Sequence, residues 1–281
     1  MNNALEIRDL TKRFDGFTLD GLNLTLPAGC IMGFIGENGA GKTTTLKLIL
    51  NMIRKDAGSI RVLGRDHLEA PAQLREELGV VMGEAGLPDC LSARQAGRVM
   101  AGIYQTWDDA RYESLLERFS LPRDKSYKDF SRGMRMKLSI AIAMSHDSRL
   151  LLLDEPTSGL DPVVRDEVVE MFGEFTRQED HSILISSHIV SDLEKICDYI
   201  AFLHEGKLML CEEKDVLLEQ YGLLHCSGEQ LSQLDPDAVR YRKESPYGAE
   251  ALVLRDRVPA GLHVSPVSIE ELFVFMVRGA R

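Results

Sequence analysis

The residues with the clearest chemical meaning form a short glycine-rich segment near the start of the chain. Residues 36–43 fit the pattern G-x-x-x-x-G-K-[ST]. Glycines let such a segment curl so that several N–H groups point at one anion, and the helix that follows turns its positive dipole end toward that anion. We expect Lys42 to reach the β- and γ-phosphates of a nucleotide, and the Thr43 hydroxyl to ligate Mg²⁺. The predicted phosphate loop and its first neighbour are Gly36, Glu37, Asn38, Gly39, Ala40, Gly41, Lys42, Thr43 and Thr44.

A second group of candidate residues follows a short apolar run at residues 149–153. That run ends in Asp154 and Glu155, and carboxylates at the carboxyl end of a buried parallel strand lie on the ligand side of a sheet. We expect Asp154 to hold Mg²⁺ and Glu155 to act as general base on the attacking water. The simpler alternative is a polar strand end that caps the helix at Pro162. It explains Asp161 well, and Asp154 and Glu155 poorly.

Alternating strands and helices are the elements that must position these residues. Apolar residues recur at helical spacing within residues 42–53, whereas residues 150–153 and 183–185 are continuously apolar. Strands that helices cover on both faces have such continuous runs, which favours a parallel sheet. The sequence therefore predicts an α/β fold with a mainly helical insert at about residues 84–145. The expected strands are residues 4–10, 18–26, 30–35, 58–63, 79–82, 149–153, 181–186, 199–203 and 207–210, and the expected helices are residues 42–53, 107–119, 134–144, 162–176 and 189–197.

The composition shifts after about residue 212, where prolines and glycines become frequent. Short strand-like pieces at residues 251–254 and 262–264 precede an apolar final helix at residues 269–277. We therefore expect residues 213–281, hereafter the appendage, to form a small α+β unit. The charged run at residues 212–215 is interpreted as a solvated start of a helix.

Composition and charge exclude several classes of protein. The chain has 281 residues, 44% of them hydrophobic and 27% charged, so it is neither disordered nor collagen-like. Its net charge of −11 argues against non-specific binding to nucleic acid. No apolar run approaches the ~18–20 residues that span a bilayer, and Glu6 and Asp9 argue against a secretory signal. The five irregularly spaced cysteines indicate free thiols in a reducing compartment.

Further segments follow one another in an order that matches a known family. They are Phe-Ser-Arg-Gly-Met at residues 130–134, Ser-Gly-Leu-Asp at residues 158–161, His188 after an apolar run, and Phe14 ahead of the phosphate loop. Together with the phosphate loop and the acidic strand end, they resemble the ATP-binding subunits of ATP-binding cassette (ABC) transporters over about residues 4–212. In that family they correspond to the Leu-Ser-Gly-Gly-Gln signature, the D-loop, the switch histidine and the aromatic residue that stacks on adenine.

The resemblance implies a P-loop NTPase cassette at residues 1–212, with a mixed or parallel sheet at its core, an antiparallel β part and the helical insert. It implies ATP and Mg²⁺ as ligands, with Lys42, Glu155 and His188 as catalytic residues. His188 would contact the γ-phosphate and position the water. The other residues expected to contact nucleotide outside the phosphate loop are Phe14, Ser131, Arg132, Gly133 and Asp161.

The resemblance also implies partners. Two cassettes, identical or different, would form a head-to-tail dimer with two ATP molecules at the interface. Closure of that dimer would drive a separate integral membrane permease, so the chain is expected to be cytoplasmic and peripheral on the inner face of the cell membrane. No nucleic acid is expected as a partner, given the acidic balance of the chain.

Two departures from the family pattern bear on function. In the signature, Arg132 stands for a glycine and Met134 for the glutamine. This form is similar to that of bacterial ATPase subunits that pair with separate ABC-2-type permeases, many of them exporters. The second departure is Gly83, which stands where the family has a glutamine that approaches Mg²⁺ and the lytic water. Glu84 could substitute for it by a shift of one residue.

Alternatives stay open for individual residues and for the whole chain. His188 could be an ordinary loop histidine, and Phe14 could be a core residue. Trp107, which opens a predicted helix, could be a packing anchor or part of the permease interface. The main hypothesis is a transport motor, and because of Gly83 the alternative is a slowly hydrolysing regulatory switch. A third hypothesis, a soluble ABC protein that acts on DNA or ribosomes, fits a single acidic cassette poorly.

Overall fold

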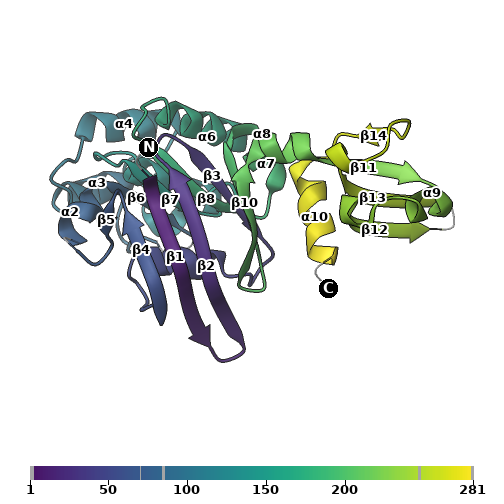
Figure 1. Cartoon of the computed structure of the whole chain (residues 1–281). Helices are drawn as coiled ribbons and strands as arrows, with labels where there is room; N and C mark the ends of the chain where they lie inside the picture. Colours follow the sequence, from purple (N-terminus) through teal and green to yellow (C-terminus); the bar gives the residue numbers. More distant parts are fainter. Residues whose placement is uncertain (1–2, 70, 84–85, 246–247, 280–281) are drawn as a thin grey trace.

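A mixed, mainly parallel sheet lies at the centre of the larger part of the molecule (Figure 1). The computed structural model describes residues 3–69, 71–83, 86–245 and 248–279. Within these residues, neighbouring strands of the sheet are parallel from β9 (Tyr199–His204) at one end to β6 (Leu78–Met82) at the other. Strand β10 (Lys207–Glu213) pairs with β9 in the antiparallel direction and forms one edge. The predicted parallel sheet is confirmed. In sheet order the strands are β10 (Lys207–Glu213), β9 (Tyr199–His204), β3 (Ile31–Gly36), β8 (Ser182–Ser187), β7 (Leu150–Asp154) and β6 (Leu78–Met82).

The central strands are apolar along their length because packed elements cover both faces of the sheet. Leu151 and Leu153 of β7 pack into one core with the helices of that face. Leu150 and Leu152 pack into a second core with the opposite layer. Each buried leucine contributes about 1.5–3 kcal/mol, and a slip of one residue would exchange the two faces, so the register of β7 is strongly specified. The helices concerned are α5 (Arg132–Ala143), α6 (Pro162–Phe175) and α7 (Val190–Ile196) on the first face and α1 (Lys42–Ile49) on the second.

An antiparallel sheet forms the outer layer on the α1 side, and its long strands cross the front of Figure 1. In β2 the alternate residues Leu22, Leu24 and Leu26 are buried and those between them are exposed or partly exposed. Such alternation is typical of a sheet with one face on the core. In sheet order the strands are β2 (Phe17–Pro27), β1 (Asn3–Phe14), β4 (Ala57–Val62) and β5 (Arg65–Asp66).

The insert is mainly helical, as predicted, and its helices begin at capping side chains. Ser92 and Gln95 form a reciprocal capping box at the start of α3, and Asp108 caps α4. The buried Tyr112 hydroxyl joins the two helices by donating to the Ala93 carbonyl oxygen at 2.7 Å. The elements of the insert are α3 (Ala93–Ala101), α4 (Asp109–Arg118), the 3₁₀ turn η1 (Tyr127–Asp129) and α5, whereas α2 (Pro71–Glu76) precedes β6 and lies outside it.

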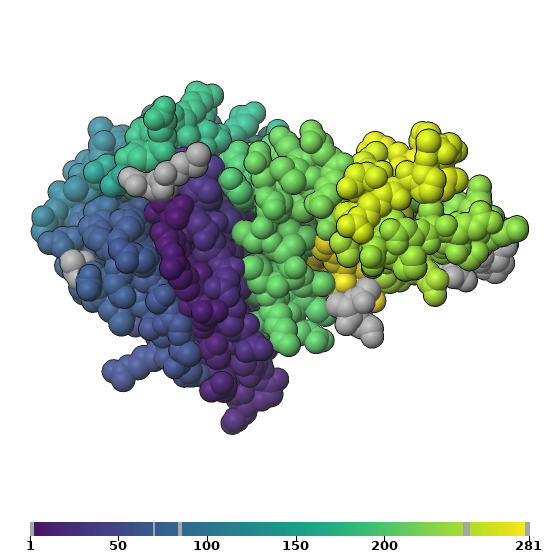
Figure 2. Space-filling view, viewed as in Figure 1, coloured from purple at the N-terminus to yellow at the C-terminus, as the bar shows by residue number. Residues whose placement is uncertain are grey.

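The appendage projects from one side of the larger part, where it is coloured light green to yellow in Figure 2. Its antiparallel sheet has the order β12-β13-β11-β14. One face of that sheet has a small core of its own, whereas α10 packs on the other face and joins the main core through Phe273, whose ring centroid lies 5.2 Å from that of Phe202 in β9. The elements are α8 (Lys214–Gln220), β11 (Tyr221–Cys226), α9 (Gly228–Ser232), η2 (Pro236–Ala238), β12 (Val239–Ser245), β13 (Gly248–Leu254), η3 (Arg255–Arg257), β14 (Val264–Ser265) and α10 (Ile269–Gly279).

The small α+β appendage is as expected, and its separation from residues 1–212 as a domain stays our proposal.

Several details differ from the sequence-based expectation. The helix predicted over residues 42–53 ends at Ile49, because Asn51 adopts a left-handed backbone with φ of 53°. Trp107 precedes α4 rather than opening it. The strands β11 and β12 were not predicted. Among the described helices, none combines the length and apolar character needed to cross a bilayer.

Gly206, in the turn between β9 and β10, offers a test of how closely β2 packs against that turn. Its φ is 78°, and a Cβ there would collide with the Thr18 carbonyl oxygen of β2. We expect Gly206→Ala to lower the free energy of unfolding by more than about 1 kcal/mol, measured by urea denaturation. Gly16→Ala is the matched control, since φ is 82° and no atom lies within 4 Å of the added Cβ. Equal losses in the two variants would contradict the close packing of β2 on this turn.

Candidate active site

The phosphate loop (residues 36–43) connects the end of β3 to the start of α1. Gly41, which precedes α1, has φ of 114°, and a Cβ there would lie 3.0 Å from the Phe17 ring. The backbone N–H and the hydroxyl of Thr45 donate to the Gly41 carbonyl oxygen at 2.9 and 3.0 Å. The loop therefore leads directly into the N-terminal end of a helix, where backbone N–H groups and the helix dipole favour an anion.

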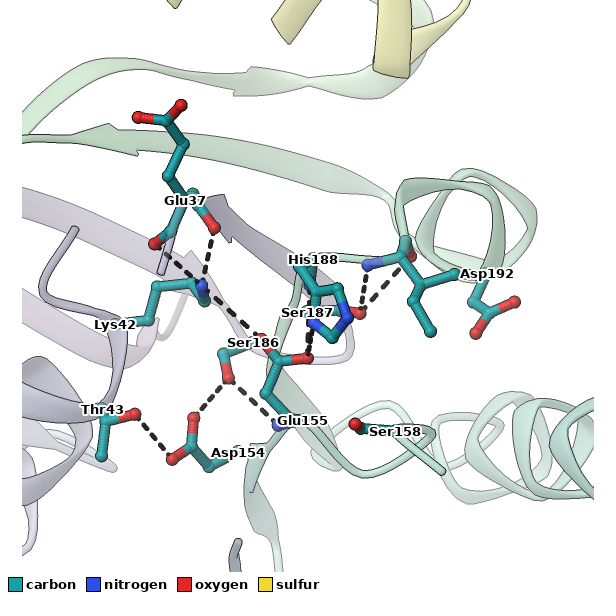
Figure 3. A network of polar contacts seen from close by, with 12 residues as sticks. Glu37, Lys42, Thr43, Asp154, Glu155, Ser158, Ser186, Ser187, His188 and Asp192 are labelled. Carbon is teal, nitrogen blue, oxygen red and sulfur yellow. Dashed lines mark hydrogen bonds and ion pairs between the residues drawn. The ribbon is translucent and has the colours of Figure 1, made fainter. Parts of the chain in front are cut away.

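The side chain of Lys42 is buried beneath the phosphate loop. Its ammonium group donates to the carbonyl oxygens of Gly36 and Glu37 at 2.6 and 3.3 Å. It also lies 3.5 Å from Glu155 Oε1. These contacts hold Lys42 against the carbonyl groups of its own loop and place its charge near the acidic end of β7 (Figure 3).

Asp154 is held from both sides at the end of β7. Thr43 Oγ1 donates to its Oδ2 atom at 2.8 Å, and Ser186 Oγ donates to its Oδ1 atom at 2.6 Å (Figure 3). Ser186 lies opposite Asp154 in the pairing of β7 with β8. The parallel register thus places the carboxylate beside the phosphate loop, as the sequence predicted.

Glu155 points elsewhere because its backbone turns out of the strand. Its φ of 52° is uncommon for a residue other than glycine. The backbone N–H of Glu155 donates to the carbonyl oxygen and the hydroxyl of Ser186 at 3.0 and 3.2 Å, which stabilises this conformation. The Glu155 carboxylate then lies 2.6 Å from His188 Nδ1 and, through its other oxygen, near Lys42. The three residues expected to be catalytic are therefore brought together.

The turn that follows β9 contacts the phosphate loop. The Gly206 N–H donates to the Ala40 carbonyl oxygen at 3.0 Å. His204, which is buried, has its Nδ1 atom 3.3 Å from Glu37 Oε2. The Gly206 hydrogen bond fixes the loop to the end of β9 as well as to β3, and the Glu37 carboxylate lies beside the His204 ring.

Phe14 lies at the end of β1, near the loop and exposed. The side chain is 45% exposed, and its ring centroid lies 6.4 Å from that of Phe17, which itself contacts Gly41. Lys12 Nζ lies 5.5 Å from the centroid of the Phe14 ring. The core alternative is wrong for Phe14, and stacking on adenine stays a prediction that its exposure favours.

The remaining predicted residues lie at the start of two helices. The Ser131 hydroxyl caps α5 by accepting from the Met134 N–H at 3.2 Å, and Asp161 caps α6 by accepting from the Val164 N–H at 3.1 Å. Arg132 packs against Gly159 and reaches Ser158 Oγ at 3.4 Å. Arg132 therefore joins the signature segment (residues 131–133) to residues 158–161 of the same chain rather than to its phosphate loop.

Gly83 follows β6 with φ of 35°, and a Cβ on it would meet open space. It lines a pocket of ≈ 260 Å³ that also includes Arg132 and Glu155. Glu84, the suggested substitute for the missing glutamine, lies outside the described residues.

Two supporting residues were missed by the sequence analysis. Ser186 contacts both Asp154 and Glu155, and its position before His188 at the end of an apolar run was the available signal. His204 was missed because only the pairing of β9 with β3 brings it beside Glu37.

Trp107 is half-buried, and its ring centroid lies 5.0 Å from that of Tyr112. That contact favours the packing-anchor alternative.

Comparisons with known proteins agree with this geometry. The family model described as ABC transporter matches residues 19–158. The chain is 30% identical over 99% of its length, and 99% of the relative's, to the ABC transporter ATP-binding protein YtrB of Bacillus subtilis (strain 168). The chain belongs to the ATP-binding subunits of ABC transporters. As a member of this family it binds ATP and is an ATPase, and the regulatory-switch alternative gains no support.

Two further likenesses concern the cassette of this ABC subunit. It is 34% identical to the bacitracin transport ATP-binding protein BcrA of Bacillus licheniformis over 74% of the chain and 69% of the relative. A solved structure titled "Structure of ATP binding subunit of ABC transporter" superposes with a TM-score of 0.69 at 28% identity, covering 77% of this chain and 92% of that one. The P-loop NTPase fold with an antiparallel β part and a helical insert is thereby confirmed.

The oxygen atoms near the phosphate loop of this ABC subunit fit a hard cation. Thr43 Oγ1 and Asp154 Oδ2 lie 2.8 Å apart, and both are ligand types that Mg²⁺ accepts. In the described part of the chain, no group of three or more His, Cys, Asp or Glu side chains could hold a metal ion. The two oxygens therefore fit a Mg²⁺ ion that arrives with phosphate oxygens.

Ser186 offers a test of how the site is positioned. Ser186→Ala removes the donor to Asp154 and one acceptor for the Glu155 N–H, so we expect kcat for ATP hydrolysis to fall by about tenfold or more. Ser182→Ala, on the same strand and equally buried, is the control, because Ser182 contacts Gly29 and Pro27 away from the site. A similar fall in kcat for both variants would contradict a positioning role for Ser186.

Proposed function

We propose that this ATPase binds Mg²⁺-ATP on the phosphate loop and hydrolyses it with Glu155 as general base. The observation that carries the proposal is the convergence of Lys42, Glu155 and His188. Glu155 Oε1 lies 3.5 Å from Lys42 Nζ, and Glu155 Oε2 lies 2.6 Å from His188 Nδ1 (Figure 3). A γ-phosphate that entered between these residues would compete with Glu155 for contact with Lys42 and His188. Glu155 would then be free to accept a proton from water.

Each residue of the group has a separate task. Lys42 and the N–H groups of the phosphate loop neutralise charge on the phosphate oxygens. Glu155 accepts the proton of the attacking water, and His188 contacts the γ-phosphate and holds that water in line. Thr43 and Asp154 would hold Mg²⁺, which supplies charge neutralisation when bound. Phe14 provides an exposed aromatic ring for the adenine base.

We further propose that the working form is a head-to-tail dimer, of two identical or two different cassettes. The signature segment (residues 131–133) contacts residues 158–161 of its own chain, through Arg132 and Ser158. That arrangement supports presentation of Ser131, Arg132, Gly133 and Asp161 together to a nucleotide on a second cassette. The Ser131 hydroxyl, the start of α5 and the Arg132 guanidinium suit a γ-phosphate.

We propose a separate integral membrane permease as the partner that dimer closure drives, with the chain peripheral on the inner face of the cell membrane. Support comes from the family to which the chain belongs. Export is the proposed direction of transport. It rests on the altered signature with Arg132 and on the likeness to BcrA, whose name refers to bacitracin transport.

Glu155→Gln tests the assignment of the general base. The amide keeps the shape of the side chain but cannot accept a proton, so we expect kcat to fall by about 10²–10⁴-fold with ATP still bound. The ATP-bound dimer should therefore accumulate, as measured by analytical ultracentrifugation with labelled ATP. Glu170→Gln, on the exposed face of α6, is the control. Hydrolysis by Glu155→Gln at the wild-type rate would exclude Glu155 as the base.

Gly83→Gln distinguishes a motor from a slow switch. Glu155 already contacts Lys42 and His188 without help from position 83, so for a motor we expect kcat to change by less than about threefold. Gly83→Ala is the control for backbone strain, because φ is 35° at this position. A large rise in kcat with glutamine alone would favour the slow regulatory switch.

A further inference from the structure

Helices α6 and α7 connect two parts of the site that lie apart along the chain. Helix α6 follows residues 158–161, and α7 begins two residues after His188. The two helices pack against each other, and an ion pair of Arg165 in α6 with Asp192 in α7 lies between them. None of the catalytic tasks assigned so far uses this pair.

The Arg165–Asp192 pair is more buried than a neighbouring ion pair on the same two helices. The side chains of Arg165 and Asp192 are 28% and 9% exposed. Asp166 and Lys195 lie 2.9 Å apart, and their side chains are 60% and 61% exposed. An exposed pair contributes only about 0–1 kcal/mol. A charge such as that of Asp192 is expensive to bury unless its partner completes its hydrogen bonds.

The two facing atoms of the buried pair lie just beyond hydrogen-bond distance. Arg165 Nε is 3.6 Å from Asp192 Oδ2. Both atoms are shielded from solvent, and across the described residues neither has a hydrogen-bond partner. An approach of about 0.5 Å would create a charge-assisted hydrogen bond that satisfies both atoms. The pair therefore favours a closer approach of α7 to Arg165.

Arg165 also contacts the segment that precedes α6. Its Nη2 atom donates to the Leu160 carbonyl oxygen at 3.4 Å. The Leu160 side chain is buried in the main core, which restrains the position of this carbonyl group, and Asp161 follows it directly. One planar guanidinium group thus connects residues 158–161 to α7.

Asp192 is closely linked to His188 along the chain. It lies in the first turn of α7, four residues after His188. The turn into this helix is fixed by Ser187, whose hydroxyl accepts from the Ile189 N–H at 2.9 Å. Figure 3 shows Asp192 on the helix that begins beside Ser187 and His188. A shift of His188 toward a phosphate is therefore transmitted to Asp192 through a short, hydrogen-bonded segment.

We propose that Arg165 and Asp192 are positioning residues that couple the two ATP sites, an inference that rests on the proposed head-to-tail dimer. When His188 contacts a γ-phosphate on its own cassette, α7 carries Asp192 Oδ2 to Arg165 Nε and the pair closes. The closed pair holds Arg165 against the Leu160 carbonyl oxygen, which orients Asp161 toward the nucleotide on the second cassette. Occupation of one site thus strengthens binding at the other, and the effect is reciprocal.

The double variant Arg165→Met, Asp192→Leu separates coupling from simple packing. Apolar residues of similar volume are often neutral or stabilising in place of a buried ion pair, so the urea midpoint of unfolding should match or exceed that of wild type. ATP hydrolysis by wild type should rise sigmoidally with ATP concentration, with a Hill coefficient between about 1.5 and 2 for two coupled sites. The double variant should give a Hill coefficient of about 1.

Two further variants complete the comparison. Asp166→Leu with Lys195→Met is the matched control, because it makes the same substitutions in the exposed pair of the same helices, and it should keep the wild-type Hill coefficient. Arg165→Lys leaves Asp192 with a cation, so no unpaired charge is buried. A lysine lacks the planar fork that contacts Asp192 and Leu160 together, so the Hill coefficient should again fall to about 1.

Analytical ultracentrifugation with a non-hydrolysable ATP analogue distinguishes failure of this coupling from failure of the dimer. Suppose that wild type dimerises. The coupling is then wrong, and the dimer stands, if both Arg165 variants keep the wild-type Hill coefficient or if wild type itself has a Hill coefficient of about 1. An equal loss in the Asp166→Leu, Lys195→Met control would also overturn the coupling. If wild type stays monomeric with the analogue, the proposed dimer is wrong and the coupling with it.

Discussion

The parallel register of β3, β8 and β7 is the constraint on which the active site depends. Ile35 pairs with Ser187, and Ser186 pairs with Asp154, so the three strands end at the same edge of the sheet. The phosphate loop, the acidic pair and His188 each follow one of these ends. Residues more than a hundred positions apart, such as Thr43 and Asp154, therefore come within hydrogen-bond distance.

The two-sided core maintains that register. Alternate leucines of β7 belong to different cores, and a slip by one residue would exchange them and remove Asp154 from Ser186. The hydrogen bonds of Ser186 also fix how the two carboxylate side chains are oriented. One holds the Asp154 carboxylate, and another stabilises the left-handed backbone of Glu155. Adjacent carboxylates thus face different atoms and can perform different tasks.

The sequence predicts the parts of the site that follow from local chemistry. The spacing of glycines, Lys42 and Thr43 defines the phosphate loop, and an apolar strand that ends in two acids defines its partner. What the sequence could not predict depends on pairing between distant elements. The contact of His204 with Glu37 requires the position of β9 beside β3. α1 ends early where Asn51 adopts a left-handed backbone, and β12, which has a bulge at Arg240, lacks the run of alternate buried leucines found at residues 22–26 of β2.

The most direct test is the ATPase activity and ATP affinity of Lys42→Ala. Lys42 is the cation that we propose contacts the phosphates at the carboxyl edge of the sheet, and its loss removes a buried charge from that position. Turnover should fall by about 10²-fold or more, with weaker ATP binding, whereas Lys47→Ala, on the same helix and away from the loop, should behave as wild type. Wild-type turnover and affinity in Lys42→Ala would contradict the assignment of this edge as the site of ATP hydrolysis.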